Sequence, residues 1–442
     1  MTQKTLPAVL TLLAVLLAPS TRAAEPANTD AAPPAATTAS DDGSAPATQE
    51  QVKALAEELR RLKLEIGLPD AEYRSFAGLG PAASKVYFVP KGLSIGGYGE
   101  AFYRNQLNDS ADDFSDILRL VLYTGYRFSD KILFNSEVEF EHQRQVFVEF
   151  AYLDFLLSDP VKLRVGNLLV PMGFTNELHE PVFFNSVERP EVERNIIPST
   201  WNENGIGIYG DLAPGLRYKL YGLGGLSSAR APAAASWIRN MRTRGGTTGG
   251  GADRSFAETF AGVAALSYEN GPAVVGVSAY RGRSGQGQTV SATDPRVISG
   301  DVTMYEAHAG FTHRGAGLRA LAVQGELDDA DLINAKHNLT GAAGVGSRVR
   351  GAYVEGAFDV LSLVASEQSL SPFVRYELLK FHDRVPTGTT RDPRLDVDVV
   401  VAGLAYKPIP TVALKADWNW RRTAAESGAV SRLLNVGAAF VF

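Results

Sequence analysis

From residue 92 to the C-terminus, apolar and polar residues alternate with a period of two. Between residues 118 and 128 the even positions are apolar or interfacial, whereas Arg119 and Arg127 occupy odd positions. The same alternation recurs over 131–141, 161–165 and 412–421. Successive side chains of a β-strand point to opposite faces. A strand with one apolar and one charged face suits a barrel that has lipid outside and water inside.

The connections between these stretches alternate between short turns and long polar segments. Short turns are expected at 129–130, 158–160, 213–215, 270–272, 315–317 and 407–410, and a less regular one at 360–368. Long polar segments are expected near 104–116, 170–203, 227–257, 283–301, 328–346, 383–394 and 423–430, and one short upper connection near 142–145. A soluble β-sandwich does not need this asymmetry, which favours a closed barrel with long loops outside.

The alternating stretches and the connections between them predict an all-β fold, a sixteen-stranded antiparallel transmembrane β-barrel. The predicted strands are 92–103, 115–128, 131–142, 145–157, 161–169, 204–212, 215–226, 258–269, 272–282, 302–314, 316–327, 347–359, 369–382, 396–407, 411–422 and 431–442. An even number of strands leaves both termini on one side, which we expect to be the periplasm. Sixteen strands leave an aqueous lumen, because side chains fill barrels of only about eight.

The composition excludes several classes of function. The chain has no cysteine and six histidines, so disulfides, thiolate metal sites and cysteine nucleophiles are excluded. The formal charge of −6 argues against a nucleic-acid partner. We expect no catalytic residue, no metal and no cofactor.

The N-terminal region divides into three expected parts. Residues 1–23 resemble a cleaved signal peptide, with Lys4 before an apolar stretch. Residues 24–48 form an Ala- and Pro-rich linker. Residues 49–67 repeat apolar positions at spacings of three and four, which predicts either a periplasmic coiled-coil helix or an amphipathic helix on the barrel. The barrel domain is expected over 85–442.

Two stretches carry a resemblance to a known family. The run RVGNLLVPMGFTNELHEP and the later ERNIIPSTWNENGIGIYGDL resemble the phosphate-selective porin O and P family and its porin-like relatives. The resemblance implies a homotrimeric sixteen-stranded porin in which segment 170–203 folds inward and narrows the pore. In the phosphate-selective members, arginines and lysines line the passage.

Three sets of residues are candidates for function. Pore-lining candidates are Arg119, Arg127, Lys131, Lys162, Arg164, Arg217, Lys219, Arg375, Lys415 and Arg421. Constriction-loop candidates are Glu177, His179, Glu180, Glu188, Arg189, Glu191, Glu193 and Arg194. Asn435, Gly437, Phe440 and Phe442 fit the C-terminal signal for outer-membrane assembly.

The charges of segment 170–203 leave the selectivity open. The segment has six glutamates and two arginines, and a negative ring would select cations. A lumen of mixed charge favours a general or weakly selective porin, with phosphate or other anions as an open possibility.

The predicted function is passive diffusion of small hydrophilic solutes across the outer membrane of a Gram-negative cell. Expected partners are outer-membrane lipid, lipopolysaccharide, the barrel assembly machinery, a permeant solute or anion and two further copies of the chain. A barrel enzyme is the alternative, suggested by His382 beside Asp383, but no serine elbow accompanies them. A secretion anchor is a second alternative, although segment 24–91 is short for a passenger or plug domain.

Overall fold

The structure is a computed structural model that describes residues 49, 50, 53, 57, 74–107, 111–243, 255–364, 366–425 and 430–442. The predicted signal peptide and linker lie outside these residues. Most of the predicted helix 49–67 also lies outside them, and its four described residues are helical.

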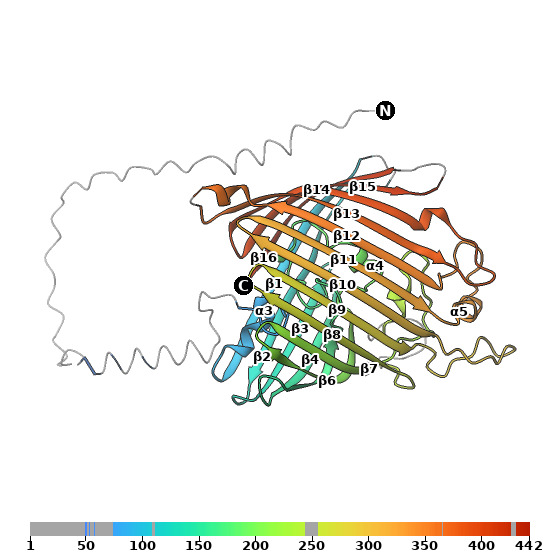
Figure 1. The fold of residues 1–442 in the computed structure, drawn as a ribbon, viewed down its shortest axis with the longest axis horizontal. Coiled ribbons are helices and arrows are strands. Elements are labelled where there is room, and N and C mark those ends of the chain that lie inside the picture. Colours follow the sequence, from blue (N-terminus) through green and yellow to red (C-terminus); the bar gives the residue numbers. More distant parts are fainter. Residues whose placement is uncertain are drawn as a thin grey trace, which may run out of the picture. The chain divides into compact units, whose positions relative to one another are not determined.

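Sixteen antiparallel strands form one closed barrel in which each strand pairs with its sequence neighbours and β1 pairs with β16 (Figure 1). The strands are β1 (Gly92–Gln106), β2 (Phe114–Arg127), β3 (Ile132–Glu141), β4 (Gln145–Leu156), β5 (Lys162–Leu169), β6 (Asn202–Ala213), β7 (Leu216–Gly224), β8 (Phe260–Asn270), β9 (Ala273–Arg283), β10 (Asp301–His313), β11 (Ala316–Leu327), β12 (Arg348–Phe358), β13 (Ser369–Arg384), β14 (Asp396–Ile409), β15 (Val412–Thr423) and β16 (Val430–Val441). The predicted fold class and strand number are confirmed.

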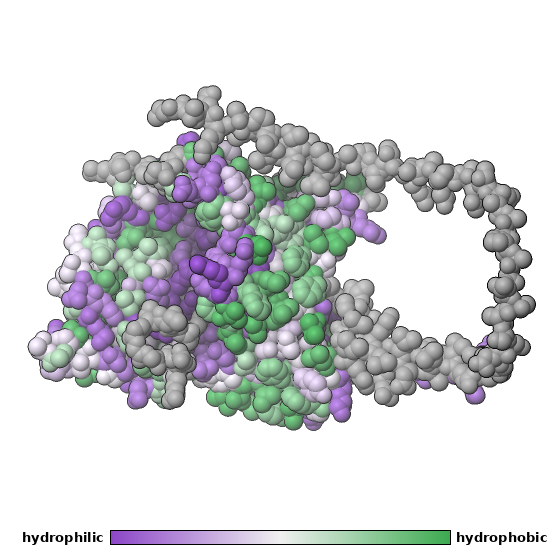
Figure 2. Space-filling view, turned by 180° about the vertical axis from the view of Figure 1, so that it is seen from behind, coloured by the Kyte–Doolittle hydropathy of each residue, from purple (hydrophilic) through white to green (hydrophobic). Residues whose placement is uncertain are grey.

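The two faces of the barrel wall have opposite character. On β2, Leu120 and Leu122 point outward and are about two-fifths exposed, whereas the intervening Val121 points inward and is fully buried. Figure 2 shows hydrophobic residues gathered over a broad area of the outer surface, beside a polar part. An outer surface of this kind is stable against hydrocarbon and costly in water.

The two ends of the barrel differ. β1 begins and β16 ends at the same edge, where the Phe442 amide donates to the Gly97 carbonyl at 2.9 Å. The short turns after β2, β4 and β6 lie at this edge, and the long connections, including helix α5 (Ala330–Lys336), lie at the other (Figure 1). Among the described residues, no helix has the length and apolar character needed to cross a membrane.

Two segments fold into the interior of the barrel. The N-terminal segment, residues 75–89, contains the short helices α3 (Pro81–Ser84) and η1 (Lys85–Tyr87). The inner loop, residues 170–201, connects β5 to β6 and contains η2 (Pro181–Phe183) and α4 (Glu191–Asn195). Most of both segments is buried, although neither contributes a strand to the wall.

Candidate functional site

The inner loop crosses the lumen and bonds to opposite sides of the wall. Near its start, His179 lies with Nε2 3.0 Å from the Glu137 carboxylate on β3. Further along, the Val187 amide donates to Asp417 on β15 at 2.6 Å, and the Val192 amide donates to Glu377 on β13 at 3.0 Å. The structure thus places this connection inside the barrel, as a constriction requires.

The acidic residues of the inner loop are each engaged by a partner. Glu177 pairs with Lys219, Glu188 with Arg104 and Arg194, and Glu191 with Arg421. Glu193 accepts from the Tyr353 hydroxyl and from Thr175, and Glu180 accepts from the amides of Ala82 and Ala83. The negative charge counted along the sequence therefore does not form a ring that faces the pore.

Nine of the ten predicted pore-lining residues belong to the inward face of the wall. Those that hold the inner loop are Lys219, Arg375, Lys415 and Arg421, which contact Glu177, Ser186, Pro181 and Glu191 respectively. Arg119 pairs with Glu100 and Glu139, Lys162 with Asp211, and Arg217 with Asp211 and Glu269. Lys131 lies outside the strands, exposed in the turn between β2 and β3, and its pore-lining role stays a prediction.

Arg164 and Arg127 hold the N-terminal segment rather than a solute path. The Arg164 guanidinium lies 4.0 Å from the ring centroid of Tyr152 and donates to Asp154 at 2.8 Å. The Tyr87 hydroxyl donates to the same carboxylate at 2.5 Å. Arg127 donates to the main-chain carbonyls of Tyr87 and Val89. Alternation along the strands predicts that these arginines point inward. It does not predict that the N-terminal segment covers them.

The C-terminal residues divide between the two faces of β16. Asn435 is buried inside, where it accepts from Arg104 at 2.9 Å and donates to Asp417 at 2.9 Å, and Gly437 packs near Val187 of the inner loop. Phe440 and Phe442 point outward and their rings stack at 6.3 Å. Asn435 thus links Arg104 and Asp417 inside the lumen. The role of Asn435, Gly437, Phe440 and Phe442 as an assembly signal stays a prediction.

His382 does not form a dyad with Asp383. Its Nε2 lies 2.8 Å from the Gly344 carbonyl, and its Nδ1 accepts from the Asp392 amide at 3.1 Å. Asp383 instead pairs with Arg348. Both ring nitrogens are therefore occupied by the main chain, which disfavours the barrel enzyme.

Two cavities lie on either side of the inner loop. The turn-side cavity, of about 540 Å³, extends from Ala77 and Glu177 to the β9–β11 wall. The loop-side cavity, of about 370 Å³, lies between the inner loop and the β1–β4 wall. Phe184 is the one residue that lines both, and it is only 5% exposed. Its ring centroid lies 3.9 Å from the Lys415 ammonium. Phe184 therefore lies between the two cavities.

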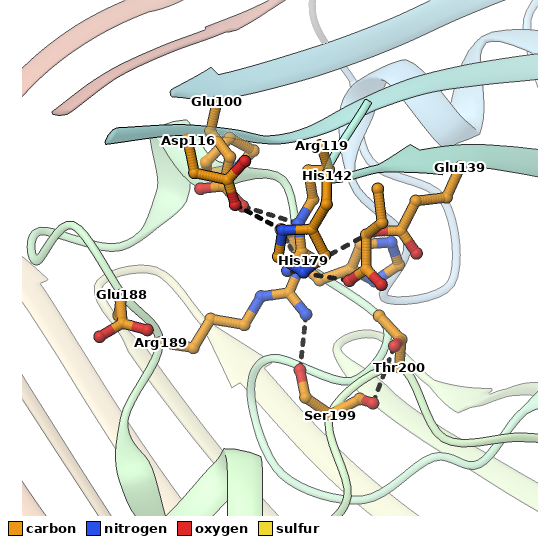
Figure 3. A network of polar contacts seen from close by, with 12 residues as sticks. Glu100, Asp116, Arg119, Glu139, His142, His179, Glu188, Arg189, Ser199 and Thr200 are labelled. Atoms are coloured by element: carbon orange, nitrogen blue, oxygen red, sulfur yellow. Dashed lines mark hydrogen bonds and ion pairs between the residues drawn. The ribbon is translucent and has the colours of Figure 1, made fainter. Parts of the chain in front are cut away.

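Basic residues predominate around both cavities. The loop-side cavity is lined by five arginines and three glutamates: Arg119, Arg189, Arg194, Arg239, Arg242, Glu100, Glu141 and Glu188. Figure 3 shows Arg189 reaching within the inner loop to Ser199, to which it donates at 2.5 Å. Among the described residues, no carboxylate forms an ion pair with Arg189, and its buried Nε has no hydrogen-bond partner. The turn-side cavity has Arg217, Lys219 and Arg319 against Glu177 and Glu269.

Glu180 joins the inner loop to the N-terminal segment through a carboxyl group whose pKa is raised. Burial raises the pKa of Glu180, which lies in the loop rather than in a strand, to about 7. The two backbone amides and His179 oppose this shift, Glu137 adds to it, and Lys85 also faces the carboxyl group. Its Oε2 is buried without a hydrogen-bond partner. Below about pH 7 the protonated form therefore predominates while the two segments are in contact.

We expect the contact between the two segments to weaken as the pH rises through about 7. A carboxyl group that holds its proton more tightly when buried stabilises the contact fully below its ordinary pKa and loses that contribution above the raised value. The contribution is on the order of 3 kcal/mol. Protection of the Ala82 and Ala83 amides from hydrogen exchange, corrected for intrinsic rates, should fall as the pH rises from about 5 to about 8. This range spans the ordinary and the raised pKa of Glu180. Glu180→Gln, which stays neutral, should remove this pH dependence, and an unchanged dependence would contradict the assignment.

The closed barrel and the loop that crosses its lumen define a β-barrel of the porin type. The anion-selective porin from Comamonas acidovorans shares this fold, with a TM-score of 0.51 at 12% identity over 80% of this chain and 100% of that chain. The outer membrane channel DcaP of Acinetobacter baumannii aligns with a TM-score of 0.49 at 12% identity, over 80% of this chain and 97% of that chain.

No family model matches the chain. An uncharacterized protein of Aquifex aeolicus (strain VF5) is 38% identical over 373 residues, which cover 81% of this chain and 82% of that protein. The chain belongs to the same family as this protein. The resemblance to the phosphate-selective porin O and P family stays a prediction.

Proposed function

We propose that the protein is an outer-membrane channel for passive diffusion of small hydrophilic solutes, with a preference for anions. The observation that carries this proposal is the pair of polar cavities inside a closed barrel, each with an excess of basic side chains. Rings of basic groups favour anions. The engaged glutamates of the inner loop remove the main electrostatic objection to such a preference.

Several further assignments belong to the same proposal. The apolar outer surface fits outer-membrane lipid, and the barrel assembly machinery would insert the chain after signal-peptide cleavage at residue 23. A homotrimer is proposed from the porin fold and the predicted helix 49–67. Phosphate is proposed as one permeant anion among several.

The test is the reversal potential of the purified protein in a planar lipid bilayer under a KCl gradient, repeated with phosphate. We expect discrete conductance steps and a reversal potential displaced toward that of chloride, because basic groups line both cavities. Reduction of the chloride current by phosphate would support phosphate as a permeant. Absence of conductance steps would contradict the channel, and a displacement toward potassium would contradict the anion preference.

Charge reversal at Arg239 should shift the selectivity toward cations. Arg239 is exposed and lines the loop-side cavity, so Arg239→Glu changes that cavity by two charges with little effect on packing. We expect the reversal potential to move toward that of potassium. Arg230→Glu is the matched control, because Arg230 lies in the same connection and does not line either cavity. Equal shifts in the two variants would indicate a general surface-charge effect instead.

A further inference from the structure

The N-terminal segment covers part of the lumen that the strands alone would leave open. It lies against the inward faces of β1 to β5, where Val86 packs on Gly125 and the Ala83 carbonyl accepts from Asn135 at 2.9 Å. On β7, Lys219 donates to the Ala77 carbonyl at 2.7 Å. Beside this segment lie the two cavities, and among the described residues Phe184 lines both of them.

Part of the wall beneath this segment is charged and stays satisfied without it, whereas another part packs with Leu79 and Val86 in the buried apolar core. Asp154 keeps Arg164 and the Tyr209 hydroxyl, which donates at 2.6 Å, when Tyr87 is removed. The Arg164 guanidinium also stays between the rings of Tyr152 and Tyr209. The charged part of this surface resembles the lining of a water-filled lumen.

The polar anchors of the segment, apart from the Tyr87 hydroxyl, are mainly backbone groups, which water can replace. The carbonyls of Ala77, Ala83, Tyr87 and Val89 accept from the wall, and the amides of Ala82 and Ala83 donate to Glu180. Two residues join the segment to β1, which starts at Gly92 with φ of +98°. This backbone conformation is accessible to glycine at little cost. The junction therefore has the freedom of a hinge.

We infer that residues 75–89 are a displaceable plug that narrows the channel at rest and opens a wider path along β1 to β5 when it leaves the lumen. This inference rests on the proposed channel function. In the seated state Tyr87, stacked on Phe76 at 3.9 Å, fills the space in front of Asp154 and Arg164. In the displaced state these two charged groups line the path.

A reversible cross-link tests the plug directly. The chain has no cysteine, so Val86→Cys with Gly125→Cys introduces a single pair. A Cβ at position 125 would lie 2.6 Å from the Val86 Cβ, so the plug must shift by about 1 Å to reach disulfide spacing, and Gly125→Cys alone is the control for that shift. We expect the conductance of the oxidised protein to fall to that of the path through the two cavities and to rise when a reductant is added. Val86→Cys alone is the matched control and should not respond to the reductant. Equal currents in the oxidised and reduced double variant would overturn the plug.

Thiol labelling separates failure of the plug from failure of the channel. Val86 is 1% exposed and Phe88 is 46% exposed in the same segment. If the plug leaves the lumen, Val86→Cys should react with a membrane-impermeant maleimide, more slowly than Phe88→Cys but at a measurable rate. Adding Tyr87→Phe should accelerate that reaction, because it removes the hydroxyl contacts with Tyr152, Asp154 and Arg164. Labelling without any current would refute the channel alone. Complete protection of Val86→Cys, with Phe88→Cys labelled, would refute the plug.

Discussion

Replacement of Asp154 by alanine is expected to lower the free energy of unfolding of the barrel by about 3–5 kcal/mol. Asp154 is fully buried and is the ion-pair partner of Arg164, which is 2% exposed. Without the carboxylate, the guanidinium stays buried without a compensating charge. Denaturant unfolding in detergent micelles, followed by the loss of β-sheet signal, would measure the change.

The double variant Asp154→Leu with Arg164→Met is the matched control. Removal of both charges leaves no uncompensated ion, and replacement of a whole buried pair by apolar residues is often nearly neutral. The double variant should therefore be more stable than Asp154→Ala. If Asp154→Ala has the same free energy of unfolding as the native protein, the ion pair does not stabilise this part of the wall.

Replacement of Phe184 by alanine is expected to increase the single-channel conductance several-fold. The two cavities meet at this side chain, and an apolar ring at a constriction excludes water and the ions that water carries. Removal of the ring joins the cavities into one hydrated path. Single-channel recording in a planar bilayer gives the conductance directly.

Phe183→Ala provides the comparison for this prediction. Phe183 precedes Phe184 in the inner loop and lines only the turn-side cavity, so its loss should leave the conductance close to the native value. A comparable increase in both variants would mean that the substitutions loosen the whole loop. No increase in Phe184→Ala would place the narrowest point elsewhere.

The strands could be predicted from the sequence because their signal is local. An alternation of period two over 131–141 or 412–421 records directly which side chains meet lipid and which meet the lumen. Local irregularities escape this reasoning. The register between β1 and β2 shifts at Glu100, and Leu118, counted with the apolar face, lines the loop-side cavity instead.

The contents of the lumen could not be predicted in the same way. Nothing in the sequence marks residues 75–89 as interior, because their burial depends on wall residues far along the chain, such as Asn135 and Lys219. Segment 24–91 was expected to be too short for a plug domain, yet fifteen residues of it are enough to cover β1 to β5.

The net charge of the inner loop could not be predicted from the sequence either. The six glutamates of segment 170–203, five of them in the inner loop, suggest a cation filter when they are counted in the sequence. Their partners come from strands as distant as β7 and β15, so neutralisation becomes visible only in three dimensions. The sign of the net charge that lines the lumen depends on these pairings rather than on the composition of one segment.

The inner loop also has a mechanical consequence. A wide cylinder made of one sheet has little resistance to flattening when the lateral pressure of the bilayer is uneven. His179 on one side and Val187 and Val192 on the other bond the loop to β3, β15 and β13. These bonds act as a cross-tie between opposite walls. They keep the cross-section open while the surrounding lipid fluctuates.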